Sequence, residues 1–306
     1  MAKIIVFGQA QFGERVFSGL RERGHDILAV SVPPRPAERP PDPLEQAARE
    51  AGIPVVQRRS YKGEEAYAEV APERADLAVL AYVTQIIPAR ILDAPRFASV
   101  CFHPSLLPAY RGGSAINWQI IRGETRSGVT LFRPDDGIDS GPIYLQREIE
   151  IGPDDSAGSF YYGKVFDVGV DATLEAVELI LSGRAQATPQ DESLATYDPL
   201  CRDEHAAIDW NEPTETVHNL IRGCDPSPGA HSRWRGETVR FYGSRRAAAK
   251  SVAPPGTVLA VGEEGIEVAT ADGSVRLAKM KAGGGKCPAA EAAASAGIEV
   301  GAVLGS

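Results

Sequence analysis

Apolar runs alternate with helical repeats along the first half of the chain, and this alternation constrains the fold more than any other feature. Residues 3–7 form a largely apolar run, a helical pattern follows up to Gly24, and residues 27–32 form a second apolar run. A strand, a helix and a strand within about thirty residues predict a βαβ unit, whose strands pair in parallel. The alternation continues to a long helical pattern that ends at Gly183. We therefore predict an α/β domain with a parallel sheet over residues 1–185.

The pattern changes in the second half of the chain. Residues 186–207 show no clear period and are predicted to be a linker, and residues 208–306 hold short apolar segments separated by turn signals such as Asp272-Gly273. Short strands at this spacing are typical of a small barrel or an open β-fold. The strands that we expect there are 238–242, 256–261, 266–269 and 275–280.

Composition and charge exclude several classes of protein. The 306 residues are 43% hydrophobic and 24% charged, which is typical of a folded chain. No apolar run approaches the roughly 18 residues that span a bilayer, so we expect no membrane partner. The net charge of −9 counts against a nucleic-acid-binding domain. The cysteines form no Cys-x-x-Cys pair, so we expect no metal site, no disulfide scaffold and a cytoplasmic location.

The loop after the first apolar run has glycines, Gly8 and Gly13, but it departs from the dinucleotide-binding motif. That motif is Gly-x-Gly-x-x-Gly, and Ala10 stands at its second glycine. Nucleotide-binding folds also place an acid after the second strand, whereas residues 33–43 hold six prolines in eleven residues. We therefore interpret the glycines as turn residues and expect no nicotinamide cofactor.

Three motifs that can carry chemistry cluster in residues 99–142. His103 ends an apolar segment, Tyr110-Arg111-Gly112-Gly113 leads into a helical pattern, and residues 135–142 form an acidic, turn-rich loop. In an open parallel sheet the carboxyl ends of the strands line the ligand crevice, so a histidine there beside acids is a candidate acid–base pair. Each residue taken singly is more often structural, and only their joint order points to a function.

That joint order resembles the formyltransferase family that uses 10-formyltetrahydrofolate. The resemblance covers nearly the whole chain, and its motifs are His103-Pro104-Ser105-Leu106-Leu107-Pro108, Arg111-Gly112, Gly128-Val129-Thr130 and Asp136-Gly137-Ile138-Asp139-Ser140-Gly141-Pro142. Further matches, at residues 114–118 and 208–210, make the chain most similar to the amino-terminal hydrolase domain of 10-formyltetrahydrofolate dehydrogenases. The resemblance implies an α/β, Rossmann-like formyltransferase domain followed by a small OB-like β-barrel domain over residues 208–306.

The resemblance also implies a set of site residues. His103 and Asp139 would be the catalytic pair, and 10-formyltetrahydrofolate would be the co-substrate, without a metal. The protonated histidine would donate to the oxygen on which charge develops, and the aspartate would orient it or move a proton. The folate-binding residues would be Gln85, Ile86, Ile87, Ser105, Leu106, Leu107, Pro108, Asp136 and Gly137.

The chain departs from the family at Cys101. Members that formylate amines carry an asparagine two residues before the histidine, and its amide donates far better than a thiol. Losing such a donor commonly costs about 10²–10³ in rate. The dehydrogenases' hydrolase domain also lacks this asparagine, so Cys101 favours that resemblance over standard amine transfer. We favour a packed, inert Cys101 over a thiol that accepts the formyl group, because only His103 stands near enough in sequence to lower its pKa.

The acceptor of the formyl group stays open. A small-molecule amine or hydroxylamine is the first hypothesis, and water or a carrier-protein thiol, which would make a hydrolase, is the second. Initiator methionyl-tRNA is less favoured because the chain is acidic, although arginines keep it open, namely Arg35, Arg39, Arg58, Arg59 and those in 233–246. A folate-binding module without turnover is the non-enzymatic alternative.

Overall fold

Two compact units interleave along the chain in the computed structural model, which describes residues 1–36, 38–247 and 252–305. Unit 1 consists of residues 1–113, 128–149 and 164–197, and unit 2 of residues 114–127, 150–163 and 198–306. The contiguous domains that the sequence suggests, with their linker at 186–207, remain predictions.

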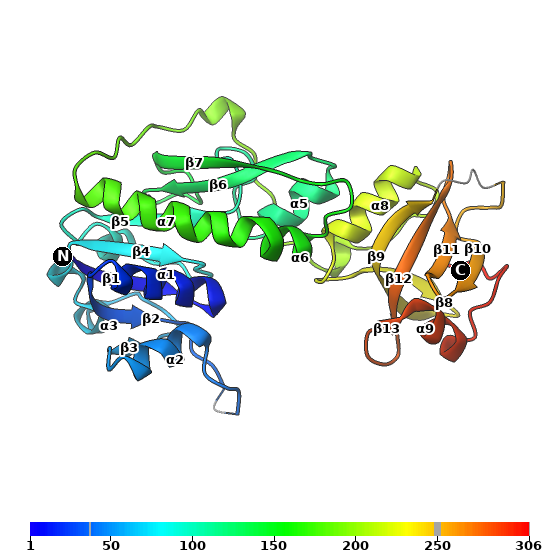
Figure 1. Ribbon diagram of the computed structural model, residues 1–306, viewed down its shortest axis with the longest axis horizontal. Helices are drawn as coiled ribbons and strands as arrows, with labels where there is room; N and C mark the ends of the chain where they lie inside the picture. Colours follow the sequence, from blue (N-terminus) through cyan, green and yellow to red (C-terminus); the bar gives the residue numbers. More distant parts are fainter. Residues whose placement is uncertain (37, 248–251, 306) are drawn as a thin grey trace. The chain divides into compact units, whose positions relative to one another are not determined.

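Unit 1 is built on a seven-stranded sheet with the order β3-β2-β1-β4-β5-β6-β7 (Figure 1). Strands β1 to β5 pair in parallel, and β6 pairs with β5 in the antiparallel direction. The predicted parallel, Rossmann-like sheet is therefore confirmed and carries an antiparallel addition. The strands are β1 (Lys3–Gly8), β2 (Asp26–Ser31), β3 (Val55–Val56), β4 (Leu77–Ala81), β5 (Ser99–His103), β6 (Arg126–Phe132) and β7 (Ile143–Glu150).

Helices cover both faces of this sheet because alternate strand residues are buried on opposite sides. Ile5 and Phe7 of β1 belong to a core cluster with Val70 and Ile91, which come from α3 and α4. On α1, buried residues recur at helical spacing, and this helix packs against α7. The helices of unit 1 are α1 (Ala10–Glu22), α2 (Pro43–Glu50), α3 (Glu64–Val70), α4 (Ala89–Leu92) and α7 (Phe166–Leu181), with short turns η1 (Pro72–Arg74) and η3 (Glu192–Leu194).

Unit 2 contains an antiparallel sheet with the order β10-β11-β12-β9-β8, and β13 pairs with β12. Its strands are β8 (Ala230–Trp234), β9 (Glu237–Ala247), β10 (Val258–Gly262), β11 (Gly265–Ala269), β12 (Ser274–Ala282) and β13 (Cys287–Pro288). The expected C-terminal β domain is confirmed, its sheet is antiparallel, and its four predicted strands correspond to β9 to β12. Strand β8 was not predicted, because His231, Ser232 and Arg233 interrupt its apolar pattern.

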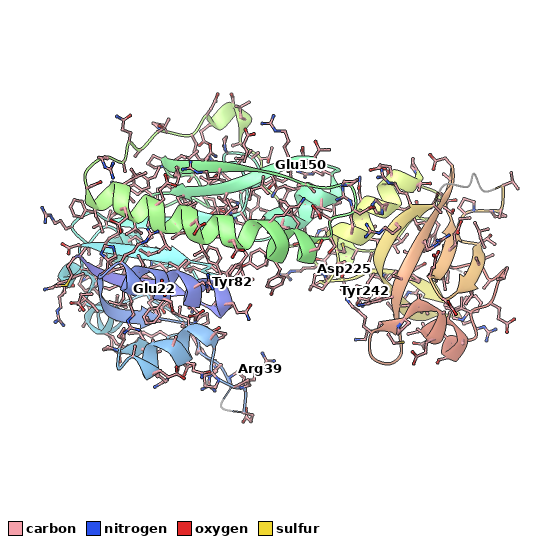
Figure 2. All side chains as sticks on the ribbon, in the orientation of Figure 1. Glu22, Arg39, Tyr82, Glu150, Asp225 and Tyr242 are labelled. Atoms are coloured by element: carbon pink, nitrogen blue, oxygen red, sulfur yellow. The ribbon has the colours of Figure 1, made fainter. Side chains whose placement is uncertain are left out.

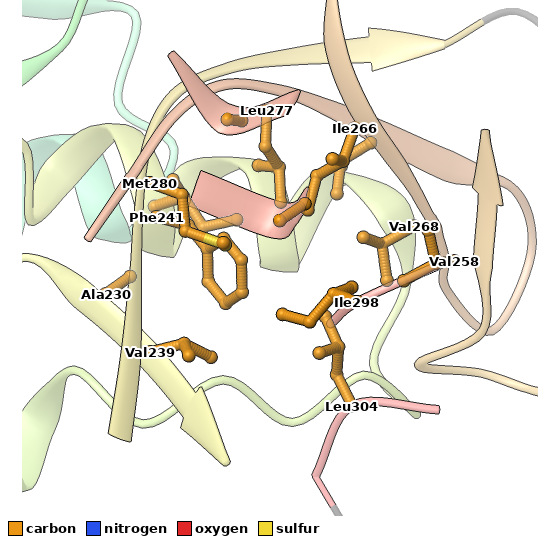
Figure 3. Packing of buried hydrophobic residues seen from close by; sticks show 14 of the residues in the cluster. Ala230, Val239, Phe241, Val258, Ile266, Val268, Leu277, Met280, Ile298 and Leu304 are labelled. Carbon is orange, nitrogen blue, oxygen red and sulfur yellow. The ribbon is translucent and has the colours of Figure 1, made fainter. Parts of the chain in front are cut away.

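The core of unit 2 lies between this sheet and its helices. Phe241, Leu277 and Met280 point into it from β9 and β12, as Figure 3 shows, together with Ile298 and Leu304 near the end of the chain. The helices are α5 (Ala115–Ile121), α6 (Ala157–Phe160), α8 (Thr214–Gly223) and α9 (Ala289–Ala296), with the short turn η4 (Asp203–His205), and the π-helix η2 (Tyr161–Val165) continues from α6 into unit 1. Within the described ranges, no helix combines the length and the apolar character that crossing a membrane requires.

Candidate active site

His103 is the last residue of β5, where the parallel strands end, and its side chain is buried. Its Nε2 lies 2.8 Å from the carbonyl oxygen of Tyr110. Since a carbonyl oxygen can only accept a hydrogen bond, Nε2 carries a proton and is the donor of this bond. Its Nδ1 lies 3.5 Å from Oδ2 of Asp139, which is longer than a direct hydrogen bond. The imidazole is therefore fixed on one side and turns its other nitrogen toward the carboxylate.

Asp139 adopts an unusual backbone conformation that needs support from its surroundings. Its φ is +53°, in the left-handed region that residues other than glycine rarely adopt. Its Oδ2 accepts a hydrogen bond from the backbone N–H of Gly112 at 2.8 Å. Its own carbonyl oxygen accepts from Nε2 of Gln190 at 2.8 Å. The structure thus brings together the two residues predicted to be catalytic, although they are 36 positions apart in the sequence.

The backbone of residues 110–112 contacts both members of this pair. The carbonyl of Tyr110 accepts from His103, and the N–H of Gly112 donates to Asp139. Tyr110 also has a positive φ of 61°. The Arg111-Gly112 motif that the sequence singled out therefore lies within a segment that holds both side chains.

Residues that the sequence assigned to a linker complete this arrangement. The guanidinium of Arg111 donates to Oε1 of Gln190 at 2.8 Å and to the carboxylate of Glu192 at 2.7 and 2.9 Å. The backbone N–H groups of Tyr110 and Arg111 donate to Oγ1 and to the carbonyl of Thr196 at 2.7 and 2.9 Å. Sequence reasoning missed these residues because an aperiodic polar segment gives no signal of its tertiary partners.

Of the expected folate wall at 105–108, two side chains face inward. Ser105 and Leu107 are buried, and Oγ of Ser105 donates to the carbonyl of Ala109 at 2.6 Å. The backbone N–H of Leu107 donates to Oγ1 of Thr130 at 3.1 Å. Leu106 and Pro108 are half-buried. Ser105 and Leu107 therefore hold the loop in place, and the side chains open to a ligand are those of Leu106 and Pro108.

The other predicted folate residues lie in the loops after β4 and β6. Ile86 is 89% exposed, whereas Ile87 is buried in the core and Nε2 of Gln85 donates to the carbonyl of Arg58 at 2.7 Å. Asp136 and Gly137 are exposed in the acidic loop. Exposure of Ile86, Asp136 and Gly137 leaves these residues accessible to a ligand.

Two recesses border these loops. Gln85 and Ile87 line a small one of about 10 Å³, together with Tyr82, which is labelled in Figure 2. Asp136 lines another of about 250 Å³, which is also bordered by α4 and by Arg133. The structure thus distributes the predicted folate residues over two neighbouring loops and does not gather them in one closed cavity.

Cys101 lies on β5 opposite Phe132 of β6 and is half-buried. Burial, and next the negative charge of Asp139, raise the pKa of its thiol above the ordinary value. Because the thiolate is the nucleophilic form, this shift opposes a role for Cys101 as an acceptor of the formyl group. The alternative, in which the thiol is an inert packed group, agrees with its environment.

The N-terminus of α1 is occupied by a carboxylate from the same unit. Asp42 accepts from the backbone N–H of Ala10 through both oxygens, at 2.8 and 3.0 Å, and also caps α2 by accepting from Leu44. In dinucleotide-binding folds the pyrophosphate lies at this helix terminus. The contact agrees with the expectation that this loop holds no nicotinamide cofactor. Over the ranges that the structure describes, no group of three or more His, Cys, Asp or Glu residues is placed to hold a metal ion.

Comparison with known families assigns the fold. A model described as formyl transferase matches residues 2–177, and one described as formyl transferase, C-terminal domain, matches residues 201–296. The chain belongs to the formyl transferase family. The resemblance inferred from the motifs around His103 and Asp139 is thereby confirmed at the level of the family.

The chain is similar to two kinds of curated relative. It is 41% identical over 268 residues to mitochondrial 10-formyltetrahydrofolate dehydrogenase of Homo sapiens, a match that covers 85% of this chain and 28% of that protein. It is 35% identical over 288 residues to methionyl-tRNA formyltransferase of Geobacter metallireducens, which covers 92% of each chain. The chain thus spans less than a third of the length of the dehydrogenase that it matches.

Solved structures share the fold. HypX from Aquifex aeolicus in complex with tetrahydrofolic acid aligns with a TM-score of 0.71 and 24% identity, over 98% of this chain and 48% of that one. WlaRD, a sugar 3N-formyl transferase solved in the presence of dTDP and 5-N-formyl-THF, aligns with a TM-score of 0.69 and 19% identity, over 93% and 99%. These alignments confirm the formyl transferase fold.

Proposed function

We propose that this formyl transferase releases the formyl group of 10-formyltetrahydrofolate to water, with His103 and Asp139 as its catalytic residues. The observation that carries the proposal is the geometry of that pair. Nε2 of His103 is held by a backbone carbonyl at 2.8 Å, and Nδ1 stands 3.5 Å from the carboxylate of Asp139. When Nδ1 carries a proton as well as Nε2, one donor and one proton acceptor face the same small region.

The chemistry of that region balances as a hydrolysis. A water oxygen adds to the formyl carbon, and Asp139 accepts the proton that the water loses. The negative charge that forms on the formyl oxygen accepts a hydrogen bond from Nδ1 of protonated His103. The carbon–nitrogen bond then breaks as Asp139 passes this proton to the folate nitrogen, and tetrahydrofolate and formic acid leave, the acid losing its own proton to become formate. Because Tyr110 holds Nε2, the imidazole keeps Nδ1 directed at the reacting group throughout.

The folate would contact the loops that contain the predicted binding residues. We infer that the exposed Ile86, Asp136 and Gly137, with Leu106 and Pro108, offer the contacting groups, because their side chains or backbone are open to solvent. The relatives and structures that name 10-formyltetrahydrofolate or tetrahydrofolic acid support a folate co-substrate. This ligand would need no metal for addition to a carbonyl.

Cys101 supports water as the acceptor over an amine. The thiol is protonated and half-buried, so it replaces the strong amide donor of amine-formylating members with a weak one. A small-molecule amine is the second candidate, because a sugar 3N-formyl transferase shares the fold over 99% of its own length. The other hypotheses are methionyl-tRNA or a carrier-protein thiol as the acceptor, and folate binding without turnover. The cytoplasmic location also remains a hypothesis.

The deciding experiment mixes the pure protein with 10-formyltetrahydrofolate without any acceptor and follows free tetrahydrofolate and formate. We expect steady release by the wild-type protein. His103→Ala and Asp139→Asn should each lower kcat by 10²-fold or more, in the order of magnitude of a lost acid–base group. Both variants should still bind tetrahydrofolate, because neither residue is assigned to the folate wall.

The outcomes separate the candidates. Binding without release by the wild-type protein would contradict hydrolysis, and a screen of amines, hydroxylamines and charged tRNA would follow. Full activity in His103→Ala would refute the proposed mechanism. A salt-sensitive gel shift with methionyl-tRNA would favour the translation enzyme, since contacts to phosphates weaken with salt.

A further inference from the structure

We propose that Gln190 is a positioning residue that holds Asp139 in its reactive orientation, and that residues 188–197, here called the clasp segment, form part of the active site. The inference rests on the proposed function of His103 and Asp139. It concerns a segment that the sequence predicts to be part of a linker. Every residue that it uses belongs to unit 1.

The side-chain amide of Gln190 binds the acidic loop at two places. Its Nε2 donates to the carbonyl of Asp139 at 2.8 Å and to the carbonyl of Gly141 at 2.7 Å. Both amide hydrogens are thus used, one on each side of Ser140. An amide with two hydrogens bound to two carbonyls fixes the direction of the backbone between them, including the left-handed φ of +53° at Asp139. Such a conformation is unfavourable for a residue other than glycine and persists only where the surroundings enforce it.

Arg111 fixes the orientation of the Gln190 amide. Nη2 and Nε of Arg111 donate to Oε1 of Gln190 at 2.8 and 3.3 Å. The same guanidinium binds both oxygens of Glu192, and its side chain is only 10% exposed. A guanidinium can only donate, so it selects the amide orientation in which Oε1 faces Arg111 and Nε2 faces the acidic loop.

The clasp segment also holds the histidine side of the site. Thr196 accepts from the backbone N–H groups of Tyr110 and Arg111. The carbonyl of Tyr110 in turn accepts a hydrogen bond from Nε2 of His103, and the backbone N–H of Gly112 donates to Asp139. At its beginning, the segment pairs with β7 through two hydrogen bonds between Thr188 and Ile143, at 2.8 and 2.9 Å. Both candidate catalytic side chains are thus held by one segment that is itself anchored to the sheet.

The test replaces Gln190 with glutamate, which has the same shape but cannot donate to the two carbonyls when ionised. Gln186→Glu is the matched control, because Gln186 is an exposed glutamine just before the clasp segment. We expect Gln190→Glu to lower kcat of formyl release by 10- to 100-fold, as is typical for partners that orient a reacting group. KM should stay within about threefold, and Gln186→Glu should match the wild type.

A double-mutant comparison separates positioning from a general structural role. If Gln190 acts through Asp139, Gln190→Glu should change the residual kcat of Asp139→Asn by less than about threefold, because the group that it positions is already disabled. Equal losses in both backgrounds would overturn the proposal. Wild-type activity in Gln190→Glu would overturn it as well.

A readout without turnover keeps this inference distinct from the proposed function. If the wild-type protein does not release formyl, hydrolysis fails, and crystal structures of the wild type and Gln190→Glu decide the role of Gln190. We expect Asp139 in the variant to leave the left-handed region and to lose its bond to Gly112. An unchanged Asp139 in that variant would refute positioning by Gln190.

Discussion

At the scale of single residues, the candidate site depends on backbone groups as much as on side chains. His103 is oriented by a carbonyl, and Asp139 by the N–H of Gly112. Neither partner can be recognised in the sequence, since these are backbone groups and do not depend on the side chain of the residue. What the residue types do specify is the chemistry: an imidazole that can donate, and a carboxylate that can accept a proton. Cys101, two residues before His103 on β5, supplies neither.

The thiol of Cys101 can be removed with little effect if this account is correct. Because burial and Asp139 raise its pKa, the thiol is protonated at neutral pH and does not attack the formyl carbon. Cys101→Ala should keep kcat of formyl release within about threefold. Steady-state release and the intact mass of rapidly quenched protein check this expectation. A formyl adduct on the wild-type protein, or a loss as large as that of His103→Ala, would establish covalent catalysis.

At the scale of elements, α8 carries buried polar side chains that bind other parts of unit 2. Nε2 of His218 donates to the carbonyl of Pro153 at 3.0 Å, and its Nδ1 accepts from Oγ of Ser244 at 2.9 Å. The neutral imidazole, with its proton on Nε2, satisfies both partners. Burial is the main cause that lowers the pKa of His218 below its ordinary value.

This lowered pKa predicts that the free energy of unfolding falls in weak acid. Below about pH 6.5 the unfolded chain binds a proton at His218 that the folded chain does not bind. The contribution of neutral His218 to the free energy of unfolding is therefore complete above that pH. It is lost as the pH falls toward the lower pKa of the folded state. Each unit of pKa difference corresponds to about 1.4 kcal/mol.

Urea unfolding at pH 7.5, 6.5 and 5.5 measures this dependence. We expect the wild-type protein to lose stability over that range, and His218→Gln to lose less of it while being less stable at pH 7.5. His231→Gln in β8 is the control and should retain the wild-type slope. An unchanged slope in His218→Gln would show that another group governs the acid response.

At the scale of the whole molecule, the chain passes between the two units several times, so each unit consists of three separate segments. Helix α5 lies between β5 and β6 in the sequence but belongs to unit 2. Nδ2 of Asn117 on α5 donates to the carbonyls of Gly223 and Ser227, at 2.8 and 3.1 Å. The buried guanidinium of Arg222 likewise donates to the carbonyl of Asp155 at 3.0 Å. Unit 2 therefore draws on segments from the middle of the chain.

These contacts predict that residues 208–306 do not fold stably on their own. The fragment would lack α5 and residues 150–163, so Arg222 and His218 would lose the carbonyls that they bind. Arg222 would keep its hydrogen bond to Asn219, but a buried guanidinium that loses its other partners is destabilising. The amide dispersion in an NMR spectrum of the fragment, and its thermal unfolding, test this, with the whole chain as the reference. A well-dispersed spectrum and a cooperative transition would show that the contiguous domain is autonomous.

The sequence by itself determined most strands of both units and the identity of the candidate catalytic pair. Burial repeats with a period of two residues in strands and 3.6 in helices, so the spacing of apolar residues indicates the local secondary structure. That is why β1 to β5 and β9 to β12 were predictable. His103 and Asp139 were recognisable because their neighbours match a family, not because their distance could be derived.

The tertiary structure alone decided which segments support that pair. Gln190 contacts Asp139 across 51 positions, and Arg111 contacts Glu192 across 81. Hydrogen bonds over such separations leave no period in the sequence, because one polar residue opposite one carbonyl is enough to form them. For the same reason, the sequence did not predict β8 or the membership of α5 in unit 2. Partners of this kind depend on the path of the whole chain, which only the folded molecule defines.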